Sequence, residues 1–164
     1  MIFITVGGGP FYGFNRLIEE IDRIAPALKE DVVVQKGCST YEPKNLTSFR
    51  FLSFNTSVSY FKKANVVVGH AGAGTILLSR MLNKPFVAVP RSHEKKEIFD
   101  AHQLETAKRI ESKEMVEVVY DIADTENAIR KSLLKINKTW PPSEGRQAAV
   151  KTIRNFLKKE KENK

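Results

Sequence analysis

A glycine-rich turn, Gly69–Thr75 (Gly-His-Ala-Gly-Ala-Gly-Thr), holds the residues best suited to bind a ligand. It follows a run of three valines and opens a segment with helical periodicity. The first N–H groups of a helix have no partner within the helix and lie at the positive end of its dipole, so they can bind an anion. Gly72 and Gly74 would let a phosphate approach the backbone, and His70 and Thr75 would offer donors. The alternative is a tight turn whose glycines serve backbone geometry alone.

Two other loops could contribute to the same site. Gly7-Gly8-Gly9-Pro10 follows the first predicted strand, and it could either pass close to a ligand or form an ordinary flexible turn. Asp100-Ala101-His102-Gln103 would begin a helix, where Asp100 suits a capping role. Carboxylate and amide side chains also make paired, directed hydrogen bonds to sugar hydroxyls, and these two interpretations of the segment remain open.

Several other chemistries find little support in the sequence. His93-Glu94-Lys95-Lys96-Glu97 is close to a helical zinc motif, but a glutamate stands where the second histidine would be. With three histidines and one cysteine, Cys38, we expect no metal site and no internal disulfide, as in a cytoplasmic protein. The dinucleotide fingerprint, the Walker lysine and the G-x-S-x-G elbow are all absent from the sequence.

Strand-like and helix-like segments alternate along the 164 residues, which is typical of a single α/β domain. We expect strands at Ile2–Val6, Asp31–Gln35, Arg50–Phe54, Val66–Val68, Phe86–Val89 and Val116–Val119, and helices at Phe14–Leu28, Ser57–Lys63, Gly74–Asn83, Asp100–Ser112, Glu126–Ile136 and Glu144–Lys159. Within the helix that follows the glycine-rich turn, Ile76, Leu77 and Met81 are expected to face inward.

Strands that are apolar throughout indicate a doubly wound parallel sheet of about six strands, covered on both faces. Ligands of such sheets bind beyond the carboxyl ends of the strands, where the strand order reverses. That rule selects three loops: Gly7–Tyr12, Gly69–Thr75 and Arg91–Gln103. We place the domain at residues 1–157 and a charged tail at residues 158–164.

The formal charge is +8, and it is concentrated near the C-terminus. From Arg146 onward there are seven basic and two acidic residues. Such a segment can bind nucleic acid, lie on an anionic membrane or form a solvated helix face. A nucleic-acid-binding domain is therefore an alternative function, although aromatic residues are not interleaved with the basic ones and no recognition module is visible.

Taken together, the three loops resemble the soluble donor-binding subunit of two-subunit GT-B glycosyltransferases of the family 28 C-terminal-domain type. That group includes the catalytic subunit of the dolichyl-diphosphate-GlcNAc N-acetylglucosaminyltransferase and bacterial exopolysaccharide subunits of the PssE type. The matching residues are Phe3–Gly7, Gly69–Thr75 and Asp100–Glu105 with Ala107, while Val89–Arg91 with Glu97 is similar to the exopolysaccharide branch. The resemblance extends from residue 1 to about residue 155.

This resemblance implies a Rossmann-like fold, equivalent to the C-terminal half of a GT-B enzyme, and a set of site residues. The UDP diphosphate would be bound by Gly7, His70, Gly72, Ala73, Gly74 and Thr75. The donor sugar and ribose would be bound by Arg91, Glu97, Asp100, His102 and Gln103, and the uracil would lie near Phe54 and Asn55. His70 could stabilise the leaving phosphate, the general base is not assigned, and no metal or cofactor is expected.

Two departures from the family pattern concern the ribose. The glutamate that often follows the glycine-rich turn is replaced by Leu78, and the histidine that commonly follows Glu97 in the exopolysaccharide group is replaced by Ile98. Glu97 could take the ribose role instead. Arg91 and His93 would suit a carboxylated sugar, but UDP-GlcNAc, UDP-glucuronic acid and UDP-galactose all remain open as donors.

A single domain would provide only one wall of a GT-B active site. The resemblance therefore implies an inverting transferase that acts with a membrane-attached, acceptor-binding partner at the cytoplasmic face of a membrane. The acceptor would be a polyprenyl- or dolichyl-diphosphate-linked saccharide. A stand-alone UDP-sugar enzyme that works as a homodimer is the remaining alternative.

Overall fold

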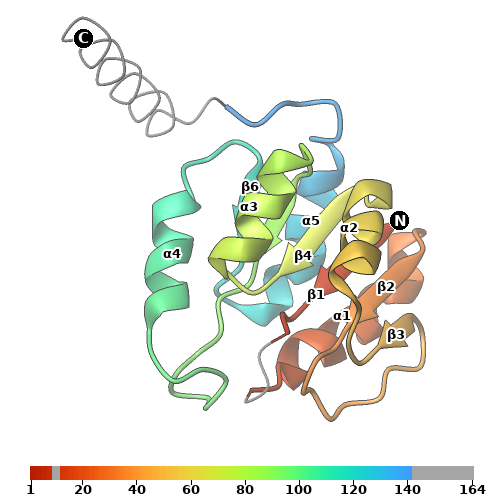
Figure 1. Ribbon diagram of the computed structural model, residues 1–164, viewed down its shortest axis with the longest axis vertical. Coiled ribbons are helices and arrows are strands. Elements are labelled where there is room, and N and C mark those ends of the chain that lie inside the picture. The colour runs from red at the N-terminus through yellow and green to blue at the C-terminus, as the bar shows by residue number, and fades with distance from the viewer. Residues whose placement is uncertain (9–11, 142–164) are drawn as a thin grey trace, which may run out of the picture.

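The computed structural model describes residues 1–8 and 12–141, which form a six-stranded parallel sheet with helices on both faces (Figure 1). The strands are β1 (Ile2–Thr5), β2 (Val32–Gln35), β3 (Thr47–Phe49), β4 (Val66–Gly69), β5 (Phe86–Ala88) and β6 (Val116–Val118). They are ordered β3-β2-β1-β4-β5-β6, and every neighbouring pair is parallel. The predicted fold class, a doubly wound Rossmann-like sheet, is confirmed.

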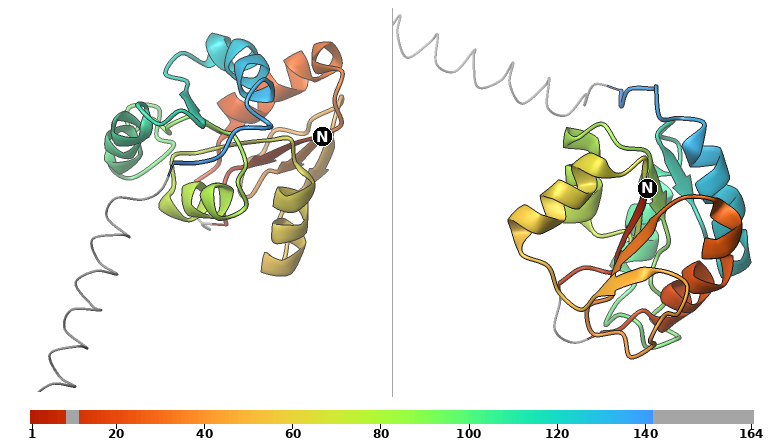
Figure 2. Two further views of the ribbon diagram at one scale, coloured as in Figure 1. Left: turned by 90° about the horizontal axis from the view of Figure 1, so that it is seen from above. Right: turned by 90° about the vertical axis from the view of Figure 1, so that its right-hand side faces the viewer.

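Five α-helices and one short 3-10 helix lie on the two faces of the sheet within the described residues. They are α1 (Asn15–Leu28), α2 (Phe54–Lys63), α3 (Ala73–Met81), α4 (His102–Ile110), η1 (Ile122–Asp124) and α5 (Thr125–Leu133). Figure 2 shows α1 and α5 on one side of the sheet and α2 and α3 on the other. No helix in the described part of the chain is both long and apolar enough to cross a membrane.

The protein has two hydrophobic cores, one on each face of the sheet, because successive side chains of β1 point to opposite faces. Ile2 and Ile4 are fully buried with the apolar face of α1 and with Ile129 of α5. Phe3 points to the other face, where its ring stacks on Tyr60 with centroids 5.3 Å apart. A strand that is buried on both faces belongs in the centre of a sheet, which is where β1 lies.

The predicted strand at Arg50–Phe54 is wrong. The edge strand is Thr47–Phe49, paired with β2, and Phe54 already begins α2. Ser53 caps that helix by accepting the Thr56 N–H at 3.1 Å, so the chain turns from strand to helix within a few residues.

The predicted inner face of α3 is also wrong for two of its three residues. Leu77 and Met81 are 57% and 72% exposed, and Ile76 alone of the three packs against the core. The fully buried position of this helix is Ser79, whose small side chain permits close packing. The predicted C-terminal helix, the domain end at residue 157 and the charged tail lie outside the described residues.

The strand order reverses between β1 and β4, which are the two central strands. Their last residues, Thr5 and Gly69, are paired in register. The loops that follow these strands therefore leave the sheet side by side, and they carry Gly7 and His70 near their starts. This is the position at which open parallel sheets bind ligands.

Candidate functional site

His70 lies in a narrow slot formed by two glycines from the neighbouring loops. A Cβ on Gly7 would lie 2.8 Å from His70 Cε1, and a Cβ on Gly72 would lie 2.3 Å from His70 Nε2. Gly7 also has a φ of +84°, which side-chain-bearing residues rarely adopt. Both glycines are thus required if the imidazole is to stay where it is, so the two loops and His70 form one unit.

The imidazole of His70 is neutral at physiological pH. Its pKa is lowered from 6.5 to about 4, chiefly by burial and secondarily by the positive charge of Arg91. Its Nδ1 atom is buried and has no hydrogen-bond partner among the described residues. A neutral imidazole carries one N–H group, which can be donated to a phosphate oxygen.

The N-terminus of α3 is open to an anion. Gly72 is the N-cap residue and has no side chain, and no acidic residue occupies the first turn. Ala73 and Gly74 are exposed, and a Cβ on Gly74 would meet nothing within 4 Å. The first turn of α3 is therefore accessible next to His70, and negative charge is favoured at such a helix N-terminus.

The predicted uracil region lies at the same edge of the sheet. Phe54 and Asn55 begin α2 and are exposed, with Phe54 at 75%. Ser57, one turn further on, donates to the Gln35 side chain at 3.1 Å, and Gln35 makes a long 3.5 Å contact with the Gly7 carbonyl. The start of α2 is therefore connected to the loop that follows β1.

Arg91 extends from the end of β5 to the loop that follows β1. Its Nη2 donates to the Val6 carbonyl at 2.7 Å and to the Tyr12 carbonyl at 3.3 Å. Burial lowers the pKa of the Arg91 guanidinium, whereas Glu97 opposes that shift. The group is thus engaged with backbone oxygens, and a sugar carboxylate would have to compete for it.

Glu97 was expected to contact ribose or sugar, and in this structure it is buried in an ion pair. Its two carboxylate oxygens accept hydrogen bonds from Arg16 Nε at 3.0 Å and Arg16 Nη2 at 2.9 Å, and one of them also accepts the Ser92 N–H at 2.9 Å. A ribose contact by Glu97 would require this pair to separate. Arg16 could not be predicted as the partner of Glu97, because 81 positions separate the two residues and no local pattern marks them.

The predicted sugar segment divides into an exposed pair and a buried amide. Asp100 accepts the His102 N–H at 3.0 Å and lies 3.0 Å from its Nδ1, and both side chains are accessible at 44% and 82%. Gln103 is buried, and its side-chain oxygen accepts the Arg91 N–H at 3.1 Å. Asp100 and His102 are therefore free to meet a ligand, and Gln103 fixes the start of α4 to the end of β5.

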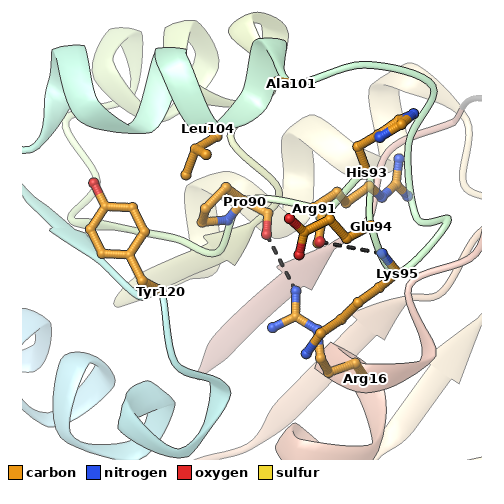
Figure 3. Close-up of a pocket in the computed structure, with 10 residues that line it drawn as sticks. Arg16, Pro90, Arg91, His93, Glu94, Lys95, Ala101, Leu104 and Tyr120 are labelled. Atoms are coloured by element: carbon orange, nitrogen blue, oxygen red, sulfur yellow. Dashed lines mark hydrogen bonds between the residues drawn. The ribbon is translucent and has the colours of Figure 1, made fainter.

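A cavity of about 410 Å³ lies beside this segment (Figure 3). Pro90, Leu104 and Tyr120 form its apolar side, and Arg16 approaches from below toward the Pro90 carbonyl, to which it donates at 3.3 Å. No group of three or more histidine, cysteine, aspartate or glutamate side chains within residues 1–8 and 12–141 could hold a metal ion.

Comparison with solved structures finds the same fold in several glycosyltransferases. A glycosyltransferase of kitacinnamycin matches with a TM-score of 0.58 at 18% identity, over 84% of this chain and 34% of that one. The calicheamicin glycosyltransferase CalG4 matches with a TM-score of 0.55 at 18% identity, over 96% of this chain and 43% of that one. This chain thus spans less than half the length of these two proteins.

The structure of ALG13 is similar over nearly its whole length. It matches with a TM-score of 0.56 at 19% identity, over 85% of this chain and 87% of that one. These identities show a shared fold. No protein of curated function matches the chain in sequence. Residues 1–160 match the glycosyltransferase family 28 C-terminal domain, and this range includes the whole sheet and the three loops predicted to bind a ligand, so the chain belongs to that family.

Proposed function

We propose that this protein is the donor-binding subunit of a UDP-sugar-dependent, inverting glycosyltransferase. The observation that carries the proposal is the slot in which Gly7 and Gly72 enclose a neutral His70 beside the open N-terminus of α3. That arrangement offers backbone N–H groups and an imidazole N–H, but no fixed charge, to a diphosphate. Family membership and the shared fold support a glycosyltransferase.

In the proposed reaction an acceptor hydroxyl oxygen attacks the anomeric carbon of the donor sugar from the face opposite the diphosphate. The bond from that carbon to the phosphate oxygen breaks, UDP leaves with the electron pair, and the hydroxyl proton passes to a general base. Hydrogen bonds from the first turn of α3 and from His70 would stabilise the charge that develops on the leaving oxygen. These donors are in place before the reaction, so little reorganisation is needed as the charge forms.

Different residues around this slot would bind different parts of the donor. The diphosphate would lie against Ala73, Gly74 and Thr75, and the uridine would extend toward Phe54 and Asn55 at the start of α2. Asp100 and His102, which are exposed at the start of α4, would meet the sugar hydroxyls. We propose that binding needs no metal ion, because helix N–H groups would take the place of a cation.

A second polypeptide would supply the acceptor wall and the general base. The similarity to ALG13, over 85% of this chain and 87% of that one, supports this proposal. We propose a membrane-attached partner that presents a polyprenyl- or dolichyl-diphosphate-linked saccharide at the cytoplasmic face of a membrane. The donor would be UDP-GlcNAc, UDP-glucuronic acid or UDP-galactose.

Calorimetry with UDP and these three UDP-sugars tests the donor site. We expect saturable binding that is unchanged by EDTA and is abolished by Gly72→Asp and by Gly74→Asp. Ser112→Asp is the matched control, because it adds the same charge in the exposed turn that precedes β6, at the opposite edge of the sheet. A folded parent protein that binds none of the four ligands refutes the proposal.

The partner requirement has its own test. The purified chain should not transfer sugar to a lipid-diphosphate saccharide until the acceptor-binding subunit is added. Turnover of UDP-sugar by the chain alone would favour the stand-alone enzyme, and tight, steeply salt-dependent binding to RNA or DNA would favour a nucleic-acid-binding domain.

A further inference from the structure

Arg16 and Glu97 join α1 to the loop between β5 and α4. The guanidinium makes two nearly parallel hydrogen bonds to the carboxylate, at 3.0 and 2.9 Å, and the two side chains are 18% and 10% exposed. The forked geometry of such a pair fixes orientation as well as distance. Further bonds, from Arg16 to the Pro90 carbonyl and from the Ser92 N–H to Glu97, hold the start of the same loop.

Arg91 forms a second connection that runs parallel to the first. Its guanidinium binds the Val6 and Tyr12 carbonyls, and its N–H is bonded to Gln103 in the first turn of α4. The guanidinium carbons of Arg91 and Arg16 lie 5.4 and 5.2 Å from the centroid of the buried Phe14 ring. Glu97 opposes the lowering of the Arg91 pKa, so its negative charge acts on both guanidinium groups.

These contacts connect the two parts of the donor site. The loop that follows β1 forms the His70 slot with α3, and the start of α4 carries Asp100 and His102. The side-chain connections made by Arg91 and by the ion pair run between these parts, beyond the ends of the sheet strands, and both arginines line the cavity of Figure 3. The distance from the slot to the sugar segment therefore depends on them.

We infer that Arg16 and Glu97 are a positioning pair for the donor sugar. This inference rests on the proposed function. The pair holds the start of α4 at the distance from the His70 slot at which one donor molecule spans both. Loss of the pair should therefore weaken the binding of the sugar portion and leave the binding of UDP nearly unchanged.

A pair that only stabilised the fold would behave differently, because partial unfolding weakens UDP and UDP-sugars equally. The informative quantity is thus the ratio of the dissociation constants of UDP and of the best-bound UDP-sugar. In Glu97→Gln this ratio should fall about tenfold, the value of one misplaced hydrogen bond, with UDP affinity within about twofold of the parent. Arg16→Lys keeps the charge but loses the fork, so it should shift the ratio in the same direction by less.

Glu126→Gln is the matched control, because it removes an arginine–glutamate pair from α5, where Arg130 donates to Glu126 at 2.7 and 3.0 Å. It should leave the ratio unchanged. The positioning role is overturned if folded Glu97→Gln keeps the parent ratio, or if UDP and UDP-sugar weaken to the same extent.

Hydrogen exchange on the ligand-free protein tests the pair independently of the proposed function. The amides of Leu104 and Glu105, which are bonded to the Ala101 carbonyl at 3.0 and 3.2 Å, should exchange about tenfold faster in Glu97→Gln. The Ile76 amide in α3 should not change. Unchanged exchange at α4 overturns the inference. A parent that binds neither ligand refutes the proposed function and with it the sugar role, and the exchange result still shows whether the pair holds α4.

Discussion

The neutral His70 should make the stability of this protein depend on pH in a definite window. The folded-state pKa is about 4, whereas the unfolded chain has the ordinary value of 6.5. Between these values the unfolded state binds more protons, so stability rises with pH. The contribution is fully present above pH 6.5 and is lost as the pH falls toward 4. A shift of this size corresponds to about 3 kcal/mol of unfolding free energy.

The assay is urea-induced unfolding of the parent and of His70→Gln at a series of pH values from 7.5 to 4. Other titrating groups, including Asp22 and Glu30, contribute equally to both proteins and cancel in the difference. The stability advantage of the parent over the variant should shrink by most of about 3 kcal/mol across the window. A difference that stays constant with pH would show that the imidazole is not held neutral, and the reasoning about burial would fail.

Binding of a diphosphate should move the same pKa in the other direction. A bound anion beside the ring favours the imidazolium, so the pKa of His70 should rise well above 4 when UDP is added. An NMR titration of the His70 ring with and without UDP measures this directly. An unchanged pKa would place the anion away from His70.

Three further predictions concern stability and the glycine-rich turn. Gly74→Ala should raise the unfolding free energy by about 0.5–1 kcal/mol, because the added Cβ meets no atom, but it should weaken UDP binding. Gly72→Ala should displace His70, so it should lower the unfolding free energy and also weaken UDP binding. Thermal unfolding and calorimetry measure these two effects. Asp22→Asn should cost about 1–3 kcal/mol of unfolding free energy at neutral pH, because the buried carboxylate accepts hydrogen bonds from three groups, the Lys44 and Asn45 N–H and the Tyr41 hydroxyl, which lower its pKa. The loss should diminish in acid, and a loss that is the same at pH 3 would contradict this. Trp140→Ala should cost about 3–5 kcal/mol in urea unfolding, because the ring is buried and its Nε1 donates to the Lys84 carbonyl at 2.8 Å; a loss below 1 kcal/mol would show that this segment packs weakly.

The central part of the fold was predictable because its signals are local. Apolar, β-branched runs such as Val66–Val68 are typical of central strands in a sheet that is covered on both faces. A glycine-rich turn after such a strand lies at the carboxyl ends of the strands, which is the edge where parallel sheets bind ligands. The error at Arg50–Phe54 has a local cause as well. Phe51 and Phe54 have the apolar character of a strand, but they are 49% and 75% exposed, and the short edge strand before them has little apolar character.

The rest of the site depends on contacts between distant segments, which no local pattern reveals. Glu97 could be singled out from its position in the loop after β5. Its partner Arg16 lies in α1, which follows β1, and is an ordinary basic residue in a helix. The orientation of α3 was mispredicted for a related reason. The small, polar Ser79 is buried, whereas the larger Leu77 and Met81 are exposed. The size and hydrophobicity of these side chains therefore do not indicate which face of α3 packs against the rest of the protein.

The parallel pairing of the sheet has a consequence for how the chain folds during synthesis. β1 is synthesised well before its partner β4, which begins at Val66, the residue paired with Ile2. Until β4 leaves the ribosome, one edge of a strand that is apolar from Ile2 to Ile4 stays unpaired, and the two loops of the His70 slot cannot meet. A nascent chain that stops before β4 should therefore need a chaperone, and binding of a donor should begin only after Thr75 has emerged.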